Sequence, residues 1–374
     1  MNKVAGIIRV DRKVLDIDKV LQMGMTFRWR KHGQIWHGVI GRNAVQLEQK
    51  NEGVAYSCVN GDSSDSGLNS ELIRFFDLER KYEIPHDDEN LTNAVGKYEG
   101  IRQLQLDPIE TLYSFICSSN NHISRISSMM TFLGSKGDLL AQIKSDTDVE
   151  PNLFRYQAFP SIETLAQLTE QELRAANFGY RAKFIVKTSA SILENGGNSW
   201  VETLKSEDYV VAVEKLMTLA GIGRKVADCI ALYGLNKRES IPLDVHLIRL
   251  ANRDYNLKEA EKGLTPTRYE GIVARLRETW GRDAGWVQTV LFYKELQLSK
   301  EKKKSPKSKR EKNKPRTEKK EVKVEVKEEP VELQSEAQVS SRKGPVVTTR
   351  RRAAQKIKTE CDEMPLKKAK EEEF

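Results

Sequence analysis

The stretch from Leu219 to Arg253, LAGIGRKVADCIALYGLNKRESIPLDVHLIRLANR, decides the fold of the central region of this chain. Gly221 and Gly223 stand one residue apart between apolar segments, which predicts two helices joined by a tight hairpin. The second helix should begin near Arg224 and direct its unpaired backbone amides, at the positive end of the helix dipole, out of the hairpin. A phosphate group fits such a helix end. The simpler alternative is a helical hairpin whose glycines serve packing alone.

Two reactive side chains follow the hairpin. Lys225 falls in the first predicted turn, and Cys229 lies four residues later on the same helical face. The lysine could pair with a phosphate. Alternatively, a partly desolvated amine near other cations loses its proton more easily and can attack an electrophilic carbon. A cysteine at such a position is usually a small core residue.

Asp244 stands where a helix N-cap belongs, after Pro242 and before an apolar run with helical periodicity. Capping is the ordinary role of a lone aspartate at such a place. A capping carboxylate in an apolar pocket can also stabilise positive charge on a sugar or transfer a proton, and the two roles are compatible. His246 is most simply a surface or packing residue, although near a phosphate it could donate a hydrogen bond.

The N-terminal region has the pattern of a β-sheet. Residues 35–40, 44–49 and 54–59 alternate in polarity and are separated by turn residues, which predicts an antiparallel meander. Residues 60–67, NGDSSDSG, read as a loop.

From about Ser70 to Leu298 the spacing of apolar residues is helical, and from Ser299 large apolar residues almost disappear. A segment of that composition cannot bury enough surface to offset its ordering entropy. The fold class is therefore α+β. We predict a β-containing N-terminal domain, an all-α helix-hairpin-helix domain and a disordered Lys/Glu-rich tail, at residues 1–105, 106–298 and 299–374.

The net charge of +8 belongs to the tail. From Lys300 onward, 24 Lys and Arg stand against 15 Asp and Glu, or +9, whereas the remaining residues carry 38 against 39, or −1. The folded part therefore cannot hold nucleic acid by gross charge, and any such site there must be local.

Sequence features that are missing limit the compartments and cofactors that we expect for this chain. No apolar run is long enough for a transmembrane helix, and the N-terminus does not resemble a secretion signal. Cys58, Cys117, Cys229 and Cys361 lie far apart with no CxxC, which favours a reducing compartment and argues against a zinc knuckle or an iron–sulfur cluster. We expect no metal, no soluble cofactor and no membrane partner.

Several segments together resemble the eukaryotic-type 8-oxoguanine DNA glycosylase/AP lyase family of the helix-hairpin-helix Gly/Pro-Asp glycosylases. Besides the hairpin with its lysine and aspartate, they are MGMTFRWR (23–30), FICSSNNHISRI (115–126), NFGYRAKFI (177–185), KVADCIALYG (225–234), PLDVHLIRLANRDY (242–255) and GWVQTVLF (285–292). The resemblance covers about residues 10–298. It implies base excision repair of 8-oxoguanine, and of formamidopyrimidine, opposite cytosine in double-stranded DNA.

The resemblance also implies roles for individual residues. Lys225 attacks the sugar C1′ carbon of a flipped nucleotide and forms a Schiff base that permits strand nicking, while Asp244 steadies the developing charge. The base pocket comprises Gly24, Cys229, Gln288 and Phe292. The orphaned cytosine and the vacated stack are contacted by Asn120, Arg125, Tyr180 and Arg181. The phosphate contacts come from Gly221, Gly223, Val226 and His246.

Without the resemblance, these residues have simpler interpretations. Gly24 would be a turn residue, Gln288 and Phe292 parts of an amphipathic helix, and the arginines solvated side chains. Met25, His122 and Tyr233 depart from the family pattern, which puts the pocket shape in doubt. Tyr233 in particular brings a hydroxyl that needs a partner.

The tail segments KKKSPKSKREKNKPR and PLKKAK resemble nuclear-import or polyanion-binding sequences, although a solvated linker is the simpler interpretation. We expect a monomer in the nucleus, recognised by import factors, with a mitochondrial form as a second location. Two alternatives to the favoured function stay open. One is an enzyme with a shifted lesion range, and the other is a non-catalytic damaged-DNA-binding helix-hairpin-helix protein, which would need neither Lys225 nor Asp244.

Overall fold

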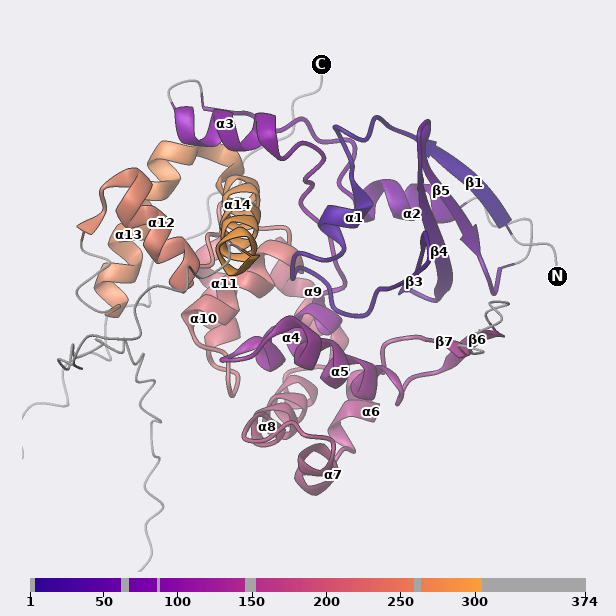
Figure 1. Ribbon diagram of the computed structural model, residues 1–374. Helices are drawn as coiled ribbons and strands as arrows, with labels where there is room; N and C mark the ends of the chain where they lie inside the picture. The colour runs from indigo at the N-terminus through magenta and orange to yellow at the C-terminus, as the bar shows by residue number, and fades with distance from the viewer. Residues whose placement is uncertain (1–3, 62–66, 86–87, 145–152, 259–263, 305–374) are drawn as a thin grey trace, which may run out of the picture. The chain divides into compact units, whose positions relative to one another are not determined.

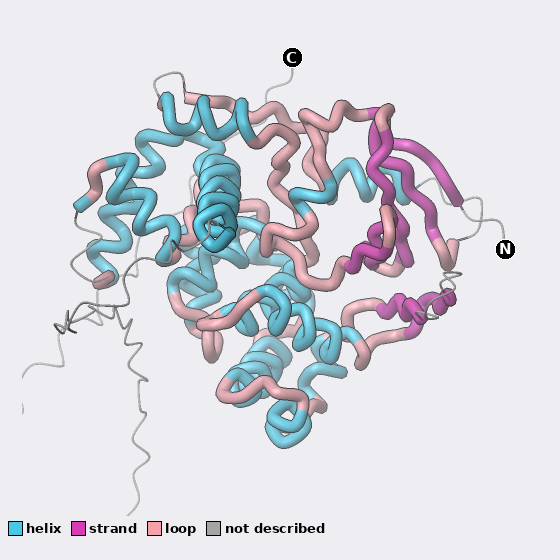
Figure 2. Tube along the Cα trace, viewed as in Figure 1, coloured by secondary structure: helices cyan, strands magenta, loops and turns pink. Residues whose placement is uncertain are grey.

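A computed structural model describes residues 4–61, 67–85, 88–144, 153–258 and 264–304. Within these residues an antiparallel sheet is followed along the chain by a larger array of helices (Figures 1 and 2). The predicted α+β class is thereby confirmed. The predicted tail lies outside the described residues from 305 onward, as do residues 62–66 of the predicted loop.

Five strands form the sheet, in the order β1-β5-β4-β3-β2, and every neighbouring pair is antiparallel. The strands are β1 (Val4–Arg9), β2 (Arg30–His32), β3 (Ile35–Ile40), β4 (Asn43–Lys50) and β5 (Gly53–Cys58). The predicted meander is confirmed as β3, β4 and β5. Strands β1 and β2 were not predicted, because β1 contains Gly6 within its apolar run and β2 has only three residues.

The helices surround a shared apolar core. They are α1 (Ile17–Val20), α2 (Gly67–Phe75), α3 (Glu89–Lys97), α4 (Pro108–Ser118), α5 (Ile123–Gly134), α6 (Ile162–Ala166), α7 (Glu170–Ala175), α8 (Arg181–Glu194), α9 (Asn198–Ser206), α10 (Tyr209–Met217), α11 (Arg224–Tyr233), α12 (Val245–Tyr255), α13 (Pro266–Trp280), the 3-10 helix η2 (Gly281–Asp283) and α14 (Ala284–Lys304). Side chains cap several of their starts. Asp107 accepts the Glu110 N–H at α4, and Thr169 forms a capping box with Glu172 at α7.

The prediction of uninterrupted helix from about residue 70 to 298 is wrong in one region. Strands β6 (Leu139–Lys144) and β7 (Leu153–Gln157) form an antiparallel pair between α5 and α6, and β7 also contacts β3. Both strands are short and only partly buried, so their alternation was too weak to stand out beside the long helical pattern. At the other end, α14 continues past Leu298 to Lys304, because its Lys- and Glu-rich end consists of good helix formers.

An extended segment from residue 101 to 107 joins the sheet side to the helical side. The Gln105 N–H donates to Phe75 O at the end of α2, and the Leu106 N–H donates to Tyr233 O at the end of α11, at 2.9 Å each. The predicted domain boundary at residue 105 falls within this segment and stays a prediction.

Helix α14 contacts α3, α12 and α13, and Figure 1 shows it seen end-on among them. Its Trp286 donates to Ile101 O at 2.9 Å and stacks on Tyr82 with ring centroids 4.4 Å apart. These contacts fix α14 against the N-terminal half of the chain. Within the described residues, no helix combines the length and apolarity needed to cross a membrane.

Candidate active site

The hairpin between α10 and α11 has the backbone that its glycines predicted. Gly221 has a φ of +78°, and a Cβ added to it would lie 2.5 Å from the ring of Phe184. Gly223 is the N-cap of α11 and makes no side-chain capping bond, so the first amides of the helix have no side-chain cap. Val226 is buried and anchors this first turn. A helix start at Arg224 is confirmed.

Lys225 is half-buried in the first turn of α11. Its ammonium lies 5.6 Å from the ring centroid of Phe115 on α4, in a cation–π contact. Burial lowers the pKa of Lys225, but Cys229 and the Asp244 carboxylate raise it, and the net pKa lies above its ordinary value. The amine is therefore protonated at neutral pH in the free protein.

This result corrects one expectation. The groups that raise the pKa of Lys225 are Cys229 and the carboxylates of Asp244 and Asp228, whereas the nucleophile alternative assumed cationic neighbours. An amine held in this form has to lose a proton before it can act as a nucleophile. Burial raises the pKa of the Cys229 thiol to about 11, so the thiol is neutral at physiological pH.

Asp244 is the N-cap of α12, as its sequence position predicted. Its Oδ1 accepts the backbone N–H groups of His246 at 2.9 Å and Leu247 at 2.8 Å. Oδ2 accepts no hydrogen bond from the described residues. One oxygen therefore fixes the carboxylate and the other is available to a ligand.

Aromatic rings form one wall of the site. Tyr233 is stacked on Phe115 with centroids 5.4 Å apart and an interplanar angle of 13°. Burial raises the pKa of the Tyr233 hydroxyl, and the side chain of Thr289 on α14 counteracts this effect. Phe115 therefore has Tyr233 stacked on it and also contacts the Lys225 ammonium.

Two of the predicted base-pocket residues lie on α14. Gln288 is buried, whereas Phe292 is half-buried and makes an edge-to-face contact with the His246 ring, with centroids 5.8 Å apart. This contact joins the helix that Asp244 caps to the face of α14 that carries Phe292. Lys225, Asp244, His246 and Phe292 thus belong to one connected group.

Comparisons with known proteins match both halves of the chain. Residues 7–112 match the family described as 8-oxoguanine DNA glycosylase, N-terminal domain, and residues 113–275 match the HhH-GPD superfamily base excision DNA repair proteins. The N-glycosylase/DNA lyase OGG1 of Arabidopsis thaliana is 34% identical over 304 residues, which are 78% of this chain and 80% of that protein. The N-glycosylase/DNA lyase of Saccharomyces cerevisiae is 31% identical over 338 residues, covering 78% and 86%.

The chain belongs to the N-glycosylase/DNA lyase family.

Solved structures agree with this assignment. The apo form of Clostridium acetobutylicum 8-oxoguanine glycosylase/lyase has a TM-score of 0.65 and 26% identity, covering 78% of this chain and 96% of that chain. The same enzyme with double-stranded DNA containing cytosine opposite 8-oxoG has a TM-score of 0.63 and 27% identity, covering 76% and 93%.

The residues that this family predicts for the opposite cytosine form a second group, around the loop between α4 and α5. Asn120 is exposed with a φ of +47°, and its carbonyl accepts an Arg181 N–H at 3.1 Å. Tyr180 is 48% exposed, and its hydroxyl donates to Ser119 O at 3.1 Å. A large exposed aromatic at the start of α8 is suited to inserting into a base stack.

The two arginines of this group differ in their surroundings. Arg125 is exposed and donates to Asn177 O at 3.0 Å. Arg181 is only 2% exposed and also donates to Ser119 O, while its buried Nε has no partner among the described residues. The solvated character that the simpler interpretation assumed is therefore wrong for Arg181. A role of either arginine in binding cytosine stays a prediction.

Gly24 and two of the positions at which the chain departs from the family pattern, Met25 and His122, have structural roles. Gly24 has a φ of +92° and faces Ile123 of α5, which confirms a turn there. Met25 is buried beside it. His122 is the N-cap of α5, and its Nδ1 accepts the Arg125 N–H at 3.4 Å.

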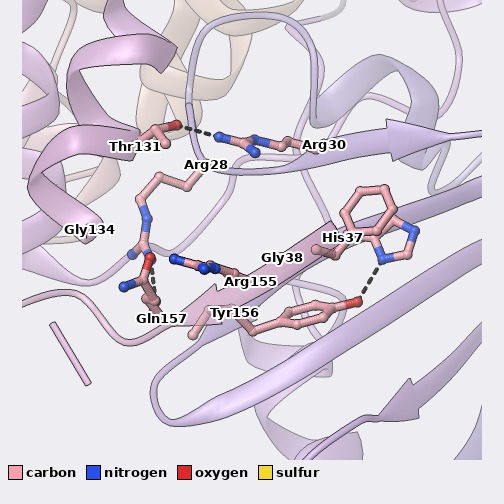
Figure 3. A pocket seen from close by; sticks show the side chains of 11 residues that line it. Arg28, Arg30, His37, Gly38, Thr131, Gly134, Arg155, Tyr156 and Gln157 are labelled. Atoms are coloured by element: carbon pink, nitrogen blue, oxygen red, sulfur yellow. Dashed lines mark hydrogen bonds between the residues drawn. The ribbon is translucent and has the colours of Figure 1, made fainter. Parts of the chain in front are cut away.

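A separate small cavity of about 60 Å³ lies between the sheet and the β6–β7 pair. Figure 3 shows Arg28, Arg30 and Arg155 around it, with His37 bonded to Tyr156 at 2.6 Å. None of the predicted site residues lines this cavity. It is therefore distinct from the connected group that includes Lys225.

Two residues near Lys225 were not predicted from the sequence. Phe115 lies in a segment that we used only for the family resemblance, and nothing in that segment indicated its contact with Lys225. Asp228 is completely buried one turn after Lys225. A charged residue among the apolar positions of KVADCIALYG was the available signal, because a buried carboxylate needs partners.

Proposed function

We propose that this chain excises 8-oxoguanine from double-stranded DNA and then acts as an AP lyase on the same site, with Lys225 as its nucleophile. The observation that carries the proposal is the amine of Lys225 in the first turn after the glycine hairpin, where its pKa is raised by the Asp244 carboxylate, whose Oδ2 accepts no hydrogen bond from the described residues. The names and DNA complex of its relatives support the substrate class.

The reaction begins with the oxidised base outside the stack. Neutral Nζ of Lys225 attacks C1′, and the electron pair of the glycosidic bond leaves with the base, which takes up a proton. Opening of the sugar ring then gives a protonated Schiff base. Removal of a C2′ proton expels the 3′ phosphate and nicks the strand. Asp244 Oδ2 faces the positive charge that develops on the sugar and can accept the proton that the ammonium releases.

The residues around Lys225 contact the lesion base, and the residues around the loop between α4 and α5 contact the opposite cytosine. The Gly24 carbonyl accepts the N7–H that distinguishes 8-oxoguanine from guanine, Gln288 reads the Watson–Crick edge, and Phe292 stacks on the base next to Cys229. Asn120, Arg125 and Arg181 bind the orphaned cytosine, while Tyr180 fills the vacated stack. The amides around Gly221, Gly223 and Val226, with His246, hold the phosphate. Formamidopyrimidine fits the same contacts and is proposed as a second substrate.

The first test is borohydride trapping with a duplex that carries 8-oxoguanine opposite cytosine. Borohydride reduces the Schiff base to a permanent crosslink, so the wild-type protein should crosslink and Lys225→Gln should not. Lys215→Gln, a lysine of α10 that is paired with Glu207, is the matched control and should crosslink like the wild type. Replacing the opposite cytosine with adenine tests the cytosine-binding residues in the same assay.

Two outcomes would contradict the proposal. A crosslink that persists in Lys225→Gln would place the nucleophile elsewhere. Tight and selective binding of the lesion without any crosslink or base release would instead indicate the non-catalytic damage-binding protein.

We further propose a monomeric enzyme that enters the nucleus through its basic tail segments, with a mitochondrial form as a second location. The proposal is supported by the charge of +9 that the sequence carries from Lys300 onward. Fusing residues 300–374 to a fluorescent protein should direct it to the nucleus, and replacing the lysines of 302–304 and 367–368 by glutamine should abolish this.

A further inference from the structure

Asp228 of α11 has no role in the mechanism above, yet it is completely buried one turn after Lys225. Its carboxylate accepts hydrogen bonds from several elements. The donors are Tyr209 OH to Oδ1 at 2.5 Å, Tyr269 OH to Oδ2 at 2.6 Å, Arg224 Nε to Oδ2 at 3.1 Å and Ser240 Oγ to Oδ1 at 3.2 Å. A carboxylate is tolerated in the interior only with such partners.

One of these partners connects Asp228 to the loop that carries Asp244. The Tyr269 hydroxyl donates its only hydrogen to Asp228 Oδ2, and the oxygen of that hydroxyl accepts the Leu243 N–H at 3.0 Å. Burial and Asp228 raise the pKa of Tyr269 well above its ordinary value, so the hydroxyl keeps this hydrogen. A single phenol therefore joins the helix of Lys225 to Leu243, the residue directly before Asp244.

The start of the same loop is also held by α11. Ser240 Oγ donates to Asp228 O at 2.8 Å. The chain from Ser240 to Leu243 is thus connected to Asp228 at both of its ends, directly at Ser240 and through the Tyr269 hydroxyl at Leu243. Leu243 and Ser240 are buried, so water does not compete for these bonds.

We propose that Asp228 and Tyr269 are positioning residues, which fix the Asp244 carboxylate relative to the amine of Lys225. Tyr269 acts through Leu243 and does not touch the DNA. This inference rests on the proposed roles of Lys225 and Asp244. A displacement of about 1 Å at a reacting group can cost on the order of 100-fold in rate, so loss of the Tyr269 hydroxyl should slow the chemistry without weakening DNA binding.

The chain offers a matched pair of variants. Tyr209 and Tyr269 are both buried, and each gives its hydroxyl hydrogen to Asp228, but Tyr209 OH accepts from the Arg224 side chain at 2.9 Å instead of from the Asp244 loop. Tyr209→Phe and Tyr269→Phe therefore remove the same group from the same carboxylate. Only Tyr269→Phe releases the Leu243 N–H.

We would measure, for both variants and the wild type, the single-turnover rate of 8-oxoguanine release, affinity for a duplex with a tetrahydrofuran abasic analogue opposite cytosine, and the urea midpoint. Tyr269→Phe should lower the rate by about tenfold or more while affinity stays within about threefold. The two tyrosine variants should lower the urea midpoint by similar amounts. The rate of Tyr209→Phe should stay within about threefold of the wild-type rate. Asp228→Asn, which keeps the shape of the side chain, should reproduce the rate loss.

An unchanged rate in Tyr269→Phe, or equal rate losses in the two tyrosine variants, would overturn the positioning role and leave Asp228 as a purely structural hub. The wild-type borohydride crosslink is measured in the same series. Its absence would contradict the proposed function instead, so the two failures are distinguishable.

Discussion

At the scale of single residues, the protonation state of Lys225 depends on opposing effects. Its amine is half-buried over the Phe115 ring, which disfavours charge through desolvation and favours it through the π-electrons, and the nearby carboxylate of Asp244 favours charge further. The raised pKa means that the amine is an ammonium in the resting protein. In the proposed mechanism Asp244 therefore has two opposite effects, because it stabilises the resting ammonium as well as the developing sugar cation.

These two effects of Asp244 can be separated by pH. The rate of Schiff-base formation on a preformed abasic site should rise as pH increases through the raised pKa of Lys225, because only the neutral amine attacks. Asp244→Asn removes a charge that raises this pKa, so the rise should shift to lower pH, while the maximal rate falls by about 100-fold. Asparagine is also a good N-cap, so α12 should keep its start. The measurement is borohydride trapping under single-turnover conditions across a pH series.

Asp254→Asn is the control for this prediction. Asp254 belongs to the same helix but pairs with Arg253 and Lys294. Its replacement should leave the pH profile unchanged. A profile for Asp244→Asn with the wild-type midpoint would show that the carboxylate does not act on the amine.

At the scale of elements, the glycine hairpin sets the relation between α8, α10 and α11. The φ of +78° at Gly221 and the Phe184 ring of α8, 2.5 Å from an added Cβ, leave no room for a side chain. The hairpin therefore presents its backbone amides because nothing else fits there. This geometry explains why a phosphate site can form in a folded region whose net charge is −1.

Gly221→Ala should accordingly destabilise the protein by about 1–3 kcal/mol, through backbone strain and overlap with Phe184. It should also weaken binding to undamaged DNA, because the amides would be displaced. The measurements are urea unfolding and fluorescence anisotropy.

Gly271→Ala provides the opposite case. Gly271 is exposed in the interior of α13 with nothing within 4 Å of an added Cβ, so alanine should stabilise the protein by about 0.5–1 kcal/mol. Equal effects of the two substitutions would contradict the argument about Gly221.

At the scale of the whole molecule, a few polar contacts tie the sheet side to the helices. Arg28, just before β2, pairs with Glu110 of α4 at 2.8 Å and donates to Gln157 O of β7 (Figure 3 shows the contact to Gln157). Burial raises the pKa of Glu110, and Arg28 counteracts this effect. The ionised pair is thus held at a junction between three separate parts of the sequence.

Arg28→Ala should leave the half-buried Glu110 without its partner and lower the free energy of unfolding by about 1–3 kcal/mol. The pKa of Glu110 in the folded state then lies still further above its unfolded value, so stability is lost as pH rises through that pKa. The loss should therefore be larger at pH 8 than at pH 5. Urea unfolding at the two pH values measures it.

Arg30→Ala is the neighbouring control. Arg30 lines the same small cavity beside the β6–β7 pair as Arg28, but it is exposed. Among the described residues it bonds only the Thr131 hydroxyl, so its replacement should change stability by less than about 0.5 kcal/mol. A loss in Arg28→Ala that does not depend on pH would argue against an ionised Glu110.

The sequence by itself determined the local features of this protein. The glycine hairpin, the start of α11 near Arg224, the N-cap at Asp244 and strands β3 to β5 are set by neighbouring residues, whose conformational preferences are visible in any short stretch. Short elements with weak alternation, such as β2, β6 and β7, were missed because they form only by pairing with distant strands.

Only the tertiary structure decided what surrounds Lys225. Phe115 of α4 and Asp244 before α12 lie far from Lys225 in the sequence, and the Asp244 carboxylate, together with Cys229, raises the pKa of the amine. The same holds for Asp228, whose partners lie on α10, α13 and the loop before α12. Electrostatic and hydrogen-bonding environments depend on distances through space, and packing sets those distances between residues that the sequence keeps far apart.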